Sequence, residues 1–459
     1  MRSGRGLRVR GVAVRSIALL LPPLMLLQGC SGDKTQSDPT AASESLEDAL
    51  ADAFRIDISE LSVTYDLWPG QDRARGTADL RFEMRPDQSR PVFHFNPIRH
   101  DRGSEENLLS AVTLDGKSLD PRDGDDVKRV RTSESAEPAF EIQRELDSGE
   151  AHTLQVRWSI PKGATPGPSG WFYTNFDDTE GPDDETETLW PTVSSPEEFA
   201  RHHVRVRVHS DRAYTVVGSG AVQRRPGREV QEWHVDTVRP VASHTVFVAA
   251  VPKKRVRTRQ VDVRGVNATI VSTRSAKKTK RAAKKTRRTI KRLVDDFGPF
   301  PTPTMQILLT GWGSGMEYYA ATRTGIGSLE HELGHMYFGS ATVNRTWRDT
   351  WIDEAAVVWW EEHDHHRLDL KSGFNSNIAG NRPPAEPGFN TRAYGPGAEI
   401  LAEIARALGG NKEMIDFLAD LHQLRAFEPY TTDDFIDDVV AAQSEIDRDQ
   451  LERWLLTPQ

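Results

Sequence analysis

Cysteine and long hydrophobic runs are scarce in this chain of 459 residues. Cys30 is the only cysteine, so no disulfide can form within the chain. The apolar stretch at residues 17–27 is about 11 residues long and holds two prolines, which is too short to span a bilayer permanently. The net charge of -9 argues against a dedicated nucleic-acid binder. No internal repeat is visible, and the length predicts two or three domains.

Residues 1–29 have the pattern of a targeting segment, because five arginines precede the apolar stretch. Leu27-Gln28-Gly29-Cys30 then resembles the lipobox of bacterial lipoproteins, in which the cysteine is lipidated. We therefore expect a signal peptide over 1–29, a lipid anchor at Cys30 and a flexible tether over 30–51. The folded part would lie outside the cytoplasm, held to a bacterial membrane. The alternative is a plain secretory signal followed by an ordinary cysteine.

Alternating apolar and polar residues predict strands from about residue 56 to residue 251. Ala78, Leu80, Phe82 and Met84 show this pattern, and turn-forming residues separate such runs. We expect an all-β sandwich or saddle domain over 52–254. The second part, 255–459, has mainly helical periodicity around a short apolar strand at 305–310, so an α+β domain with a helical C-terminal part is predicted.

His331-Glu332-Leu333-Gly334-His335 is the motif that indicates a chemistry. Four residues advance about 6 Å along a helix and about 40° around it, so both histidines fall on one face and can bind one ion. Catalytic zinc sites have three protein ligands and leave one position open, and Glu354 follows after 18 intervening residues as the third ligand. Glu332 is the expected general base. We predict one catalytic zinc ion; the alternative is a purely structural pair of helices.

Several of these residues together resemble the gluzincin aminopeptidase family, which includes aminopeptidase N and leukotriene hydrolase. His331 to Gly339 is similar to the family's His-Glu-x-x-His-x-Trp-Phe-Gly, and Trp351-Ile352-Asp353-Glu354 to its Trp-Leu-Asn-Glu. The spacing to the third ligand is also the family's own. The resemblance implies a thermolysin-like fold for residues 255–459.

Two further segments extend the resemblance to substrate-binding residues. Tyr394-Gly395-Pro396-Gly397-Ala398 is similar to the family's Tyr-x-x-Gly-Ala and implies that Tyr394 stabilises the transition state by donating a hydrogen bond. Gly315, Met316 and Glu317 resemble part of its Gly-Ala-Met-Glu-Asn motif, so Glu317 would bind the free α-amine of a peptide. The motif's last residue is Tyr318 here, and no second amine-binding element is recognisable. The alternative for Tyr394 is a tyrosine that only packs on the core, and the alternative for Glu317 is a solvated charge at a strand end.

Three charged segments do not belong to the motifs that resemble the aminopeptidase family. Ten of the sixteen residues from Lys277 to Arg292 are basic, and their phase predicts one amphipathic helix whose outer face is solvated or touches an anionic membrane or envelope polymer. The acidic stretch at 175–187 is interpreted as a solvated loop, or else as a wall that attracts cationic substrate ends. Residues 362–366, which include three histidines, are interpreted as a solvated helix end.

These observations predict an extracytoplasmic zinc metallopeptidase that removes N-terminal residues from peptides. The alternatives are a gluzincin endopeptidase or other zinc hydrolase that does not read a free amine, and a non-catalytic surface binding protein with the same fold. The expected partners are a peptide substrate and the membrane, with no nucleic acid. A monomer is compatible with the sequence, which leaves oligomeric state, side-chain preference and natural substrate open.

Overall fold

The computed structural model describes most of the chain beyond residue 55. The described residues are 56–86, 89–95, 109–122, 124–131, 138–160, 171–174, 192, 198–227, 230–311, 313–345, 349–363, 393–443 and 446–456. The signal segment, Cys30, the tether and the acidic stretch at 175–187 lie outside them. Within the described part, no helix is long and apolar enough to cross a membrane.

The first part of the chain forms one large sheet and two small ones. The large sheet has the order β12-β13-β10-β1-β2-β8-β4-β5, with β14 paired to β10. Its strands are β1 (Ile56–Trp68), β2 (Arg73–Met84), β4 (Leu109–Leu114), β5 (Lys117–Leu119), β8 (Ala151–Ile160), β10 (Phe199–Val208), β12 (Ala221–Arg225), β13 (Gln231–Asp236) and β14 (Val241–Ala242). The small sheets are β3 (Val92–His94), β7 (Pro138–Ile142) and β6 (Val127–Arg131), and β11 (Tyr214–Gly218), β15 (Phe247–Pro252) and β9 (Trp171–Thr174).

Strict alternation along the strands builds the core of this part. In β2 the residues from Ala74 to Met84 are buried at every second position, because successive side chains point to opposite faces of a sheet. The buried face of the large sheet shares one core with the small sheets; for example, Phe82 of β2 packs edge to face on Phe93 of β3. The expected β sandwich is therefore confirmed.

A second, five-stranded sheet carries the rest of the fold. Its order is β16-β17-β18-β20-β19, formed by β16 (Arg257–Val263), β17 (Val266–Ser272), β18 (Thr304–Leu309), β20 (Ala321–Thr324) and β19 (Gly315–Tyr318). The strand β18 fits the apolar run expected at 305–310. The edge strand β19 runs antiparallel to β20, and it contacts α3 (Leu329–Gly334).

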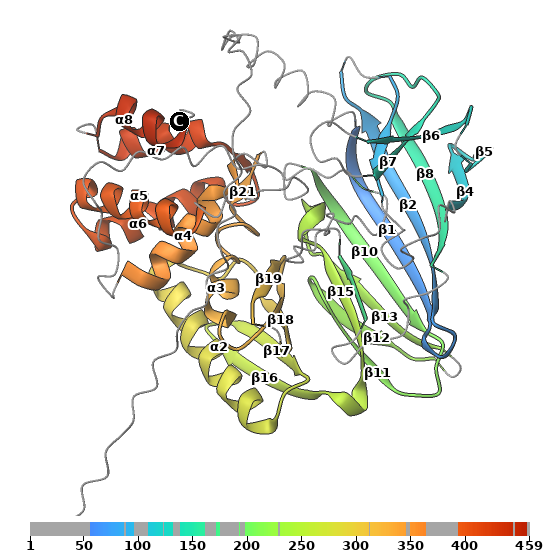
Figure 1. The fold of residues 1–459 in the computed structure, drawn as a ribbon, viewed down its shortest axis with the longest axis horizontal. Coiled ribbons are helices and arrows are strands. Elements are labelled where there is room, and N and C mark those ends of the chain that lie inside the picture. The colour runs from blue at the N-terminus through green and yellow to red at the C-terminus, as the bar shows by residue number, and fades with distance from the viewer. Residues whose placement is uncertain are drawn as a thin grey trace, which may run out of the picture. The chain divides into compact units, whose positions relative to one another are not determined.

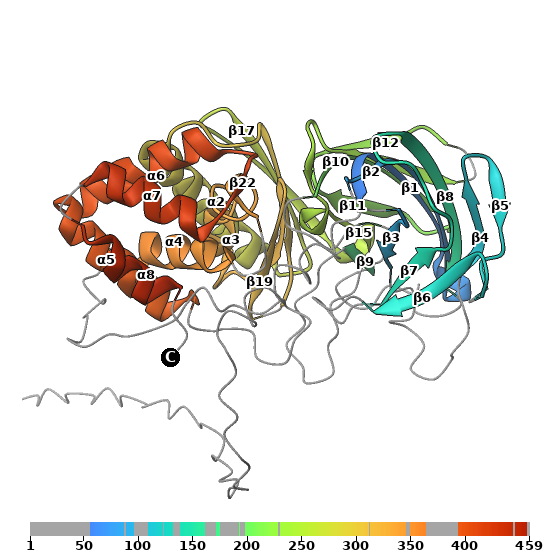
Figure 2. The same ribbon diagram turned by 90° about the horizontal axis from the view of Figure 1, so that it is seen from above.

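Helices cover this sheet and continue away from it (Figure 2). They are α2 (Ala276–Phe297), α3, α4 (Trp351–Glu362), α5 (Gly395–Leu408), α6 (Asn411–Arg425), α7 (Thr432–Ala442) and α8 (Arg448–Leu455). Thr431 caps α7 with a reciprocal capping box that it forms with Asp434. The α4 helix packs between α3 and α5, and its tryptophans are buried.

The helix α2 lies along the five-stranded sheet (Figure 1). Its buried residues include Ala283, Thr286, Ile290, Leu293 and Phe297, as their helical spacing predicted. The basic residues occupy the opposite, exposed face. The α+β fold with a helical C-terminal part is confirmed, whereas the boundary at 254/255 stays a prediction.

Candidate active site

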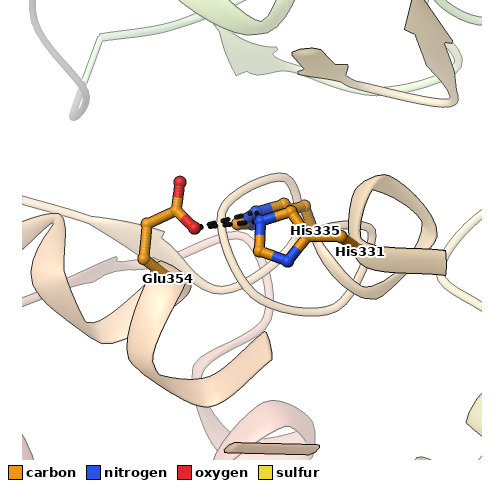
Figure 3. Close-up of side chains that lie close together, drawn as sticks. All are labelled: His331, His335 and Glu354. Atoms are coloured by element: carbon orange, nitrogen blue, oxygen red, sulfur yellow. Dashed lines mark hydrogen bonds and ion pairs between the residues drawn. The ribbon is translucent and has the colours of Figure 1, made fainter. Parts of the chain in front are cut away.

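Three side chains from α3 and α4 meet at one point (Figure 3). The Nε2 atoms of His331 and His335 are 3.1 Å apart, and Glu354 Oε2 lies 3.1 Å from the first and 3.4 Å from the second. A tetrahedral ion with bonds of 2.0–2.1 Å has ligand atoms about 3.3 Å from one another. The three atoms are therefore spaced as the corners of a zinc coordination sphere.

The local backbone keeps the two histidines in register although α3 is short. The helix ends at Gly334, and His335 is its C-cap with φ -61° and ψ -10°. The amide of His335 still donates to the carbonyl of His331 at 3.3 Å, so the spacing of four residues works as in a longer helix. A side chain at Gly334 would meet Val357 of α4, which explains the close packing of the two helices.

Hydrogen bonds on the far side of each ring orient the imidazoles. His331 Nδ1 donates to Glu361 Oε2 at 3.2 Å, and His335 Nδ1 donates to the carbonyl of Phe338 at 3.1 Å. With hydrogen on Nδ1, each Nε2 carries a lone pair toward the other ring and toward Glu354. Three acceptors that converge in this way repel one another unless a cation lies between them.

The charge balance around the rings favours a cation as well. Burial opposes protonation of His331, but hydrogen bonds that the protonated ring donates to Glu354 and Glu361 outweigh it and raise its pKa to about 10. The pKa of His335 is also raised, since the charges of Glu317 and Glu354 overcome burial. Histidines that are made so basic lie in a strongly negative site, so the donors and the charge both fit Zn²⁺.

Glu332 lies beside this cluster without belonging to the ligand set. It is buried, and burial together with the charge of Glu317 raises its pKa to about 8. The strand β19 passes directly over it, because a Cβ added to Gly315 would lie 2.3 Å from Glu332 Oε1. A side chain at position 315 would displace the carboxylate of Glu332. With glycine there, Glu332 is placed as a proton acceptor next to the proposed metal ligands.

Glu317 comes from the same edge strand, β19, rather than from the loop after β18. Its pKa is raised by burial, and it interacts electrostatically with His335 and Glu354. Tyr318, which stands where the family motif has asparagine, points into the core and stacks on Phe247 with ring centroids 4.5 Å apart. Met316 is buried in that core too, so it supports the strand, while Glu317 and Gly315 lie on the face toward the site.

Tyr394 is the N-cap residue of α5 and stacks on His331, with ring centroids 6.2 Å apart and planes 19° from parallel. Burial, the charge of Glu354 and a hydrogen bond to it raise the pKa of the phenol far above its usual value. The hydroxyl therefore keeps its proton and can act as a hydrogen-bond donor. The structure brings Tyr394 and the metal-ligand set together as expected.

Two carboxylates at the site were missed in the sequence. Glu361 lies seven residues after Glu354, which is two turns further along α4 and on the same face. This spacing is the signal in the sequence that could have identified Glu361 as the hydrogen-bond partner of His331. Asp353 accepts hydrogen bonds from the amide of Glu354 at 2.6 Å and from Asn344 Nδ2 at 3.3 Å. Burial, followed by the charge of Glu354, raises its pKa. No motif in the sequence indicated that Asn344 would be the hydrogen-bond partner of Asp353.

The solvated helix end expected at 362–366 needs correction at His363. This residue is buried, stacks on Trp359 and donates from Nδ1 to the carbonyl of Trp360 at 2.9 Å. Its ring packs against the helix because Trp359 lies four residues earlier, on the same side of the helical turn. Residues 364–366 lie outside the described residues.

Comparisons with known proteins point to one group of folds. No protein-family model matches the sequence. Leukotriene A-4 hydrolase of Xenopus laevis is 24% identical over a match that covers 23% of this chain and 22% of that protein. An M1 zinc metallopeptidase of Deinococcus radiodurans superposes with a TM-score of 0.64 and 20% identity, over 88% of this chain and 95% of that one.

Two more solved structures extend this likeness. A mutant of the Deinococcus radiodurans enzyme bound to the substrate Tyr-Ser-Ala has a TM-score of 0.63 at 19% identity, covering 88% and 96% of the two chains. Native yeast LTA4 hydrolase has a TM-score of 0.66 at 15% identity, covering 88% of this chain and 68% of that one. The chain therefore has the two-part fold of M1 zinc metallopeptidases, and the predictions of an enzyme and of zinc agree with these neighbours.

Proposed function

We propose that this protein is a zinc-dependent metallopeptidase and that it acts as an aminopeptidase. The observation that carries the proposal is the convergence of His331, His335 and Glu354 at tetrahedral spacing. Zinc bound there supplies Lewis-acid polarisation of the scissile carbonyl and a lowered pKa for the attacking water.

The residues around the ligands have complementary tasks in peptide hydrolysis. Glu332 takes a proton from the attacking water and later gives one to the departing amine, which its buried carboxyl group is suited to do. The negative charge that develops on the carbonyl oxygen is stabilised by a hydrogen bond from Tyr394. A scaffold that only binds ligands needs neither a proton acceptor nor such a donor.

Glu317 supports the narrower proposal of an aminopeptidase. Its carboxylate lies on an edge strand that runs past Glu332, and it interacts with both histidines. An ion pair between Glu317 and the free α-amine of a peptide would place the first peptide bond at the metal. Substrates that lack the amine would then lose this positioning.

We also propose that the enzyme works outside the cytoplasm, anchored through a lipid on Cys30. The support is the arginine-rich and apolar segment followed by Leu27-Gln28-Gly29-Cys30. Mass spectrometry of the protein from a bacterial membrane fraction tests this. A Cys30→Ser variant that stays in that fraction in equal amount would contradict the anchor.

Hydrolysis of aminoacyl anilides and short peptides tests the function. We expect cleavage of free-amine substrates, one zinc per chain, loss of activity with a chelator and recovery with added zinc. The same peptides with an acetylated N-terminus should be cleaved poorly. Equal cleavage of acetylated peptides would favour the endopeptidase alternative, while no chelator-sensitive hydrolysis across a broad peptide library would favour a binding protein.

A further inference from the structure

Basic side chains of α2 and β16 form a second charged region, separate from the metal site. We call it the basic face; it consists of Arg257, Arg259, Lys277, Lys278, Lys280, Arg281 and Lys284. All seven side chains are exposed, and none of them forms an ion pair with a described acidic residue. The protein as a whole has a net charge of -9, so this concentration of cations is local.

Two parts of α2, residues 276–284 and residues 285–297, differ in how their cations are balanced. In the second part, Lys285, Arg288 and Arg292 pair with Glu330, and Lys291 pairs with Asp295. Residues 276–284 hold five exposed cations and no carboxylate. A solvated helix face is usually stabilised by opposite charges at neighbouring positions, and residues 276–284 lack them.

The position of these cations along the helix is also unfavourable for the helix itself. The first turn of α2 has no acidic residue, and Lys277, Lys278, Lys280 and Arg281 lie within its first six residues. Cations near a helix N-terminus oppose the macrodipole, whereas anions are favoured there. Positive charge on side chains at a helix N-terminus adds to the positive end of the dipole, and both favour an anionic ligand.

The strand β16 extends the basic face beyond the helix. Val261 and Val263 of this strand belong to the core that α2 covers, so Arg257 and Arg259, at alternate positions, lie on the α2 side. Arg257 Nη1 donates to the carbonyl of Arg274 at 3.1 Å, next to the N-cap Ser275 of α2. Protection of an edge strand accounts for cations on β16 but not for those on the helix.

We propose that the basic face is a docking surface for an anionic phospholipid bilayer. The exposed large apolar side chains of the described residues are Val238 and Leu424, and neither belongs to the basic face. The contact is therefore electrostatic and lies on the headgroups, with no insertion and no aromatic side chains to stack on bases. Export and the lipid at Cys30, both proposed above, would bring the protein to a membrane, although the peptidase activity does not depend on this contact.

Vesicle binding tests the docking surface with a full-length chain that carries Cys30→Ser, so that no acyl chain contributes. Vesicles of phosphatidylcholine alone are compared with vesicles that also contain phosphatidylglycerol. We expect binding only to the anionic vesicles, and binding that weakens as salt is added. The triple variant Lys277→Gln, Lys280→Gln and Lys284→Gln should bind at least about tenfold more weakly, since each basic residue contributes to attraction by the surface.

A matched control removes three cations that are already paired. The variant Arg264→Gln, Arg288→Gln and Lys291→Gln loses the same charge from ion pairs with Asp295 and Glu330, and its vesicle binding should change by less than about threefold. Circular dichroism and peptide hydrolysis check that both variants fold. Equal losses in the two variants, no binding of the parent chain, or binding to soluble polyphosphate but not to vesicles would each overturn the proposal.

Discussion

Buried histidines occur in two regions of this protein and respond to burial in opposite ways. His94 and His202, in the β sandwich, are 1% exposed, and burial lowers their pKa to about 4 and about 3. His335 is buried and His331 is partly buried, but the neighbouring carboxylates raise the pKa of both. Burial by itself therefore makes a histidine neutral, and only a surplus of carboxylates reverses the shift.

The opposite pKa shifts distinguish histidines that only pack in a core from histidines at a candidate metal site. His202 Nε2 lies 3.2 Å from Ser243 Oγ, and its surroundings need no ion. The two histidines of the site have three carboxylates in close range, Glu354, Glu361 and Glu317, which a structural core would avoid. An excess of negative charge around paired imidazoles is stable when a divalent cation balances it.

His335→Ala should have the largest effect, because it removes one of three metal ligands. We expect the purified variant to contain no zinc and its peptide hydrolysis to fall to the background rate. His202→Ala in the β sandwich is the comparison, and it should lower the melting temperature but keep the zinc. Metal analysis by mass spectrometry gives the result; zinc that stays in His335→Ala would contradict the assignment of the ligands.

Glu332→Gln should reduce kcat by about 10²- to 10⁴-fold, the usual contribution of a general base. The zinc content should stay at that of the wild type, since the carboxylate is not a ligand. Steady-state kinetics and metal analysis on the same sample separate the two effects. If the zinc is lost together with the activity, Glu332 supports the site and is not its base.

Tyr394→Phe should lower kcat by about 10²- to 10³-fold, because the substitution removes one hydrogen-bond donor to the transition state. The ring stays stacked on His331, so zinc content and melting temperature should hardly change. An unchanged kcat would mean that Tyr394 only packs against the ligand.

Glu361→Ala should weaken zinc binding by about 10- to 100-fold, the range typical for an outer-shell partner of a metal ligand. Without Glu361, Nδ1 of His331 loses its hydrogen-bond acceptor, so the imidazole can adopt the tautomer with its proton on Nε2. Competition with a chelator measures the affinity. Glu362→Ala, one position further along α4, is the matched control and should leave the affinity unchanged.

The acid response of the β sandwich should be the smallest effect. His202 binds a proton in the unfolded chain near pH 6.5 but not in the folded one until about pH 3, so its contribution to stability is complete above pH 6.5 and is lost as the pH falls. Between pH 7 and pH 5 this one group lowers the free energy of unfolding by about 2 kcal/mol.

Urea denaturation at the two pH values tests this with a neighbouring pair of variants. His202→Gln should reduce the loss of stability between pH 7 and pH 5, whereas His203→Gln should not, because the side chain of His203 is 43% exposed and pairs with Asp236. The same pH dependence in both variants would show that burial of His202 does not control the response.

The periodic parts of the fold were predictable from the sequence. Apolar residues alternate along β2 and β10 and recur at helical spacing along α2. Each pattern places the apolar side chains on one face of its element, and that face has to be buried. The ligands were predictable too, because a spacing of four residues places two histidines on one side of a helical turn wherever that turn lies.

The surroundings of the ligands depended on contacts between distant segments. Glu361 becomes a partner of His331 only because α4 packs against α3, and Tyr318 turns into the core because Phe247 of β15 stacks on it. No local rule in the sequence contains these distances. They result from how the elements pack.

The sequence by itself predicted the chemistry, through His331, Glu332, His335 and Glu354, since the roles proposed for them follow from residue type and helical spacing. Only the tertiary structure decided the electrostatics, because a pKa depends on every charge nearby. It brought Glu317, Glu361 and Tyr394 from three other places in the chain to the two histidines. That assembly distinguishes a site that calls for a cation from the neutral histidines buried in the β sandwich.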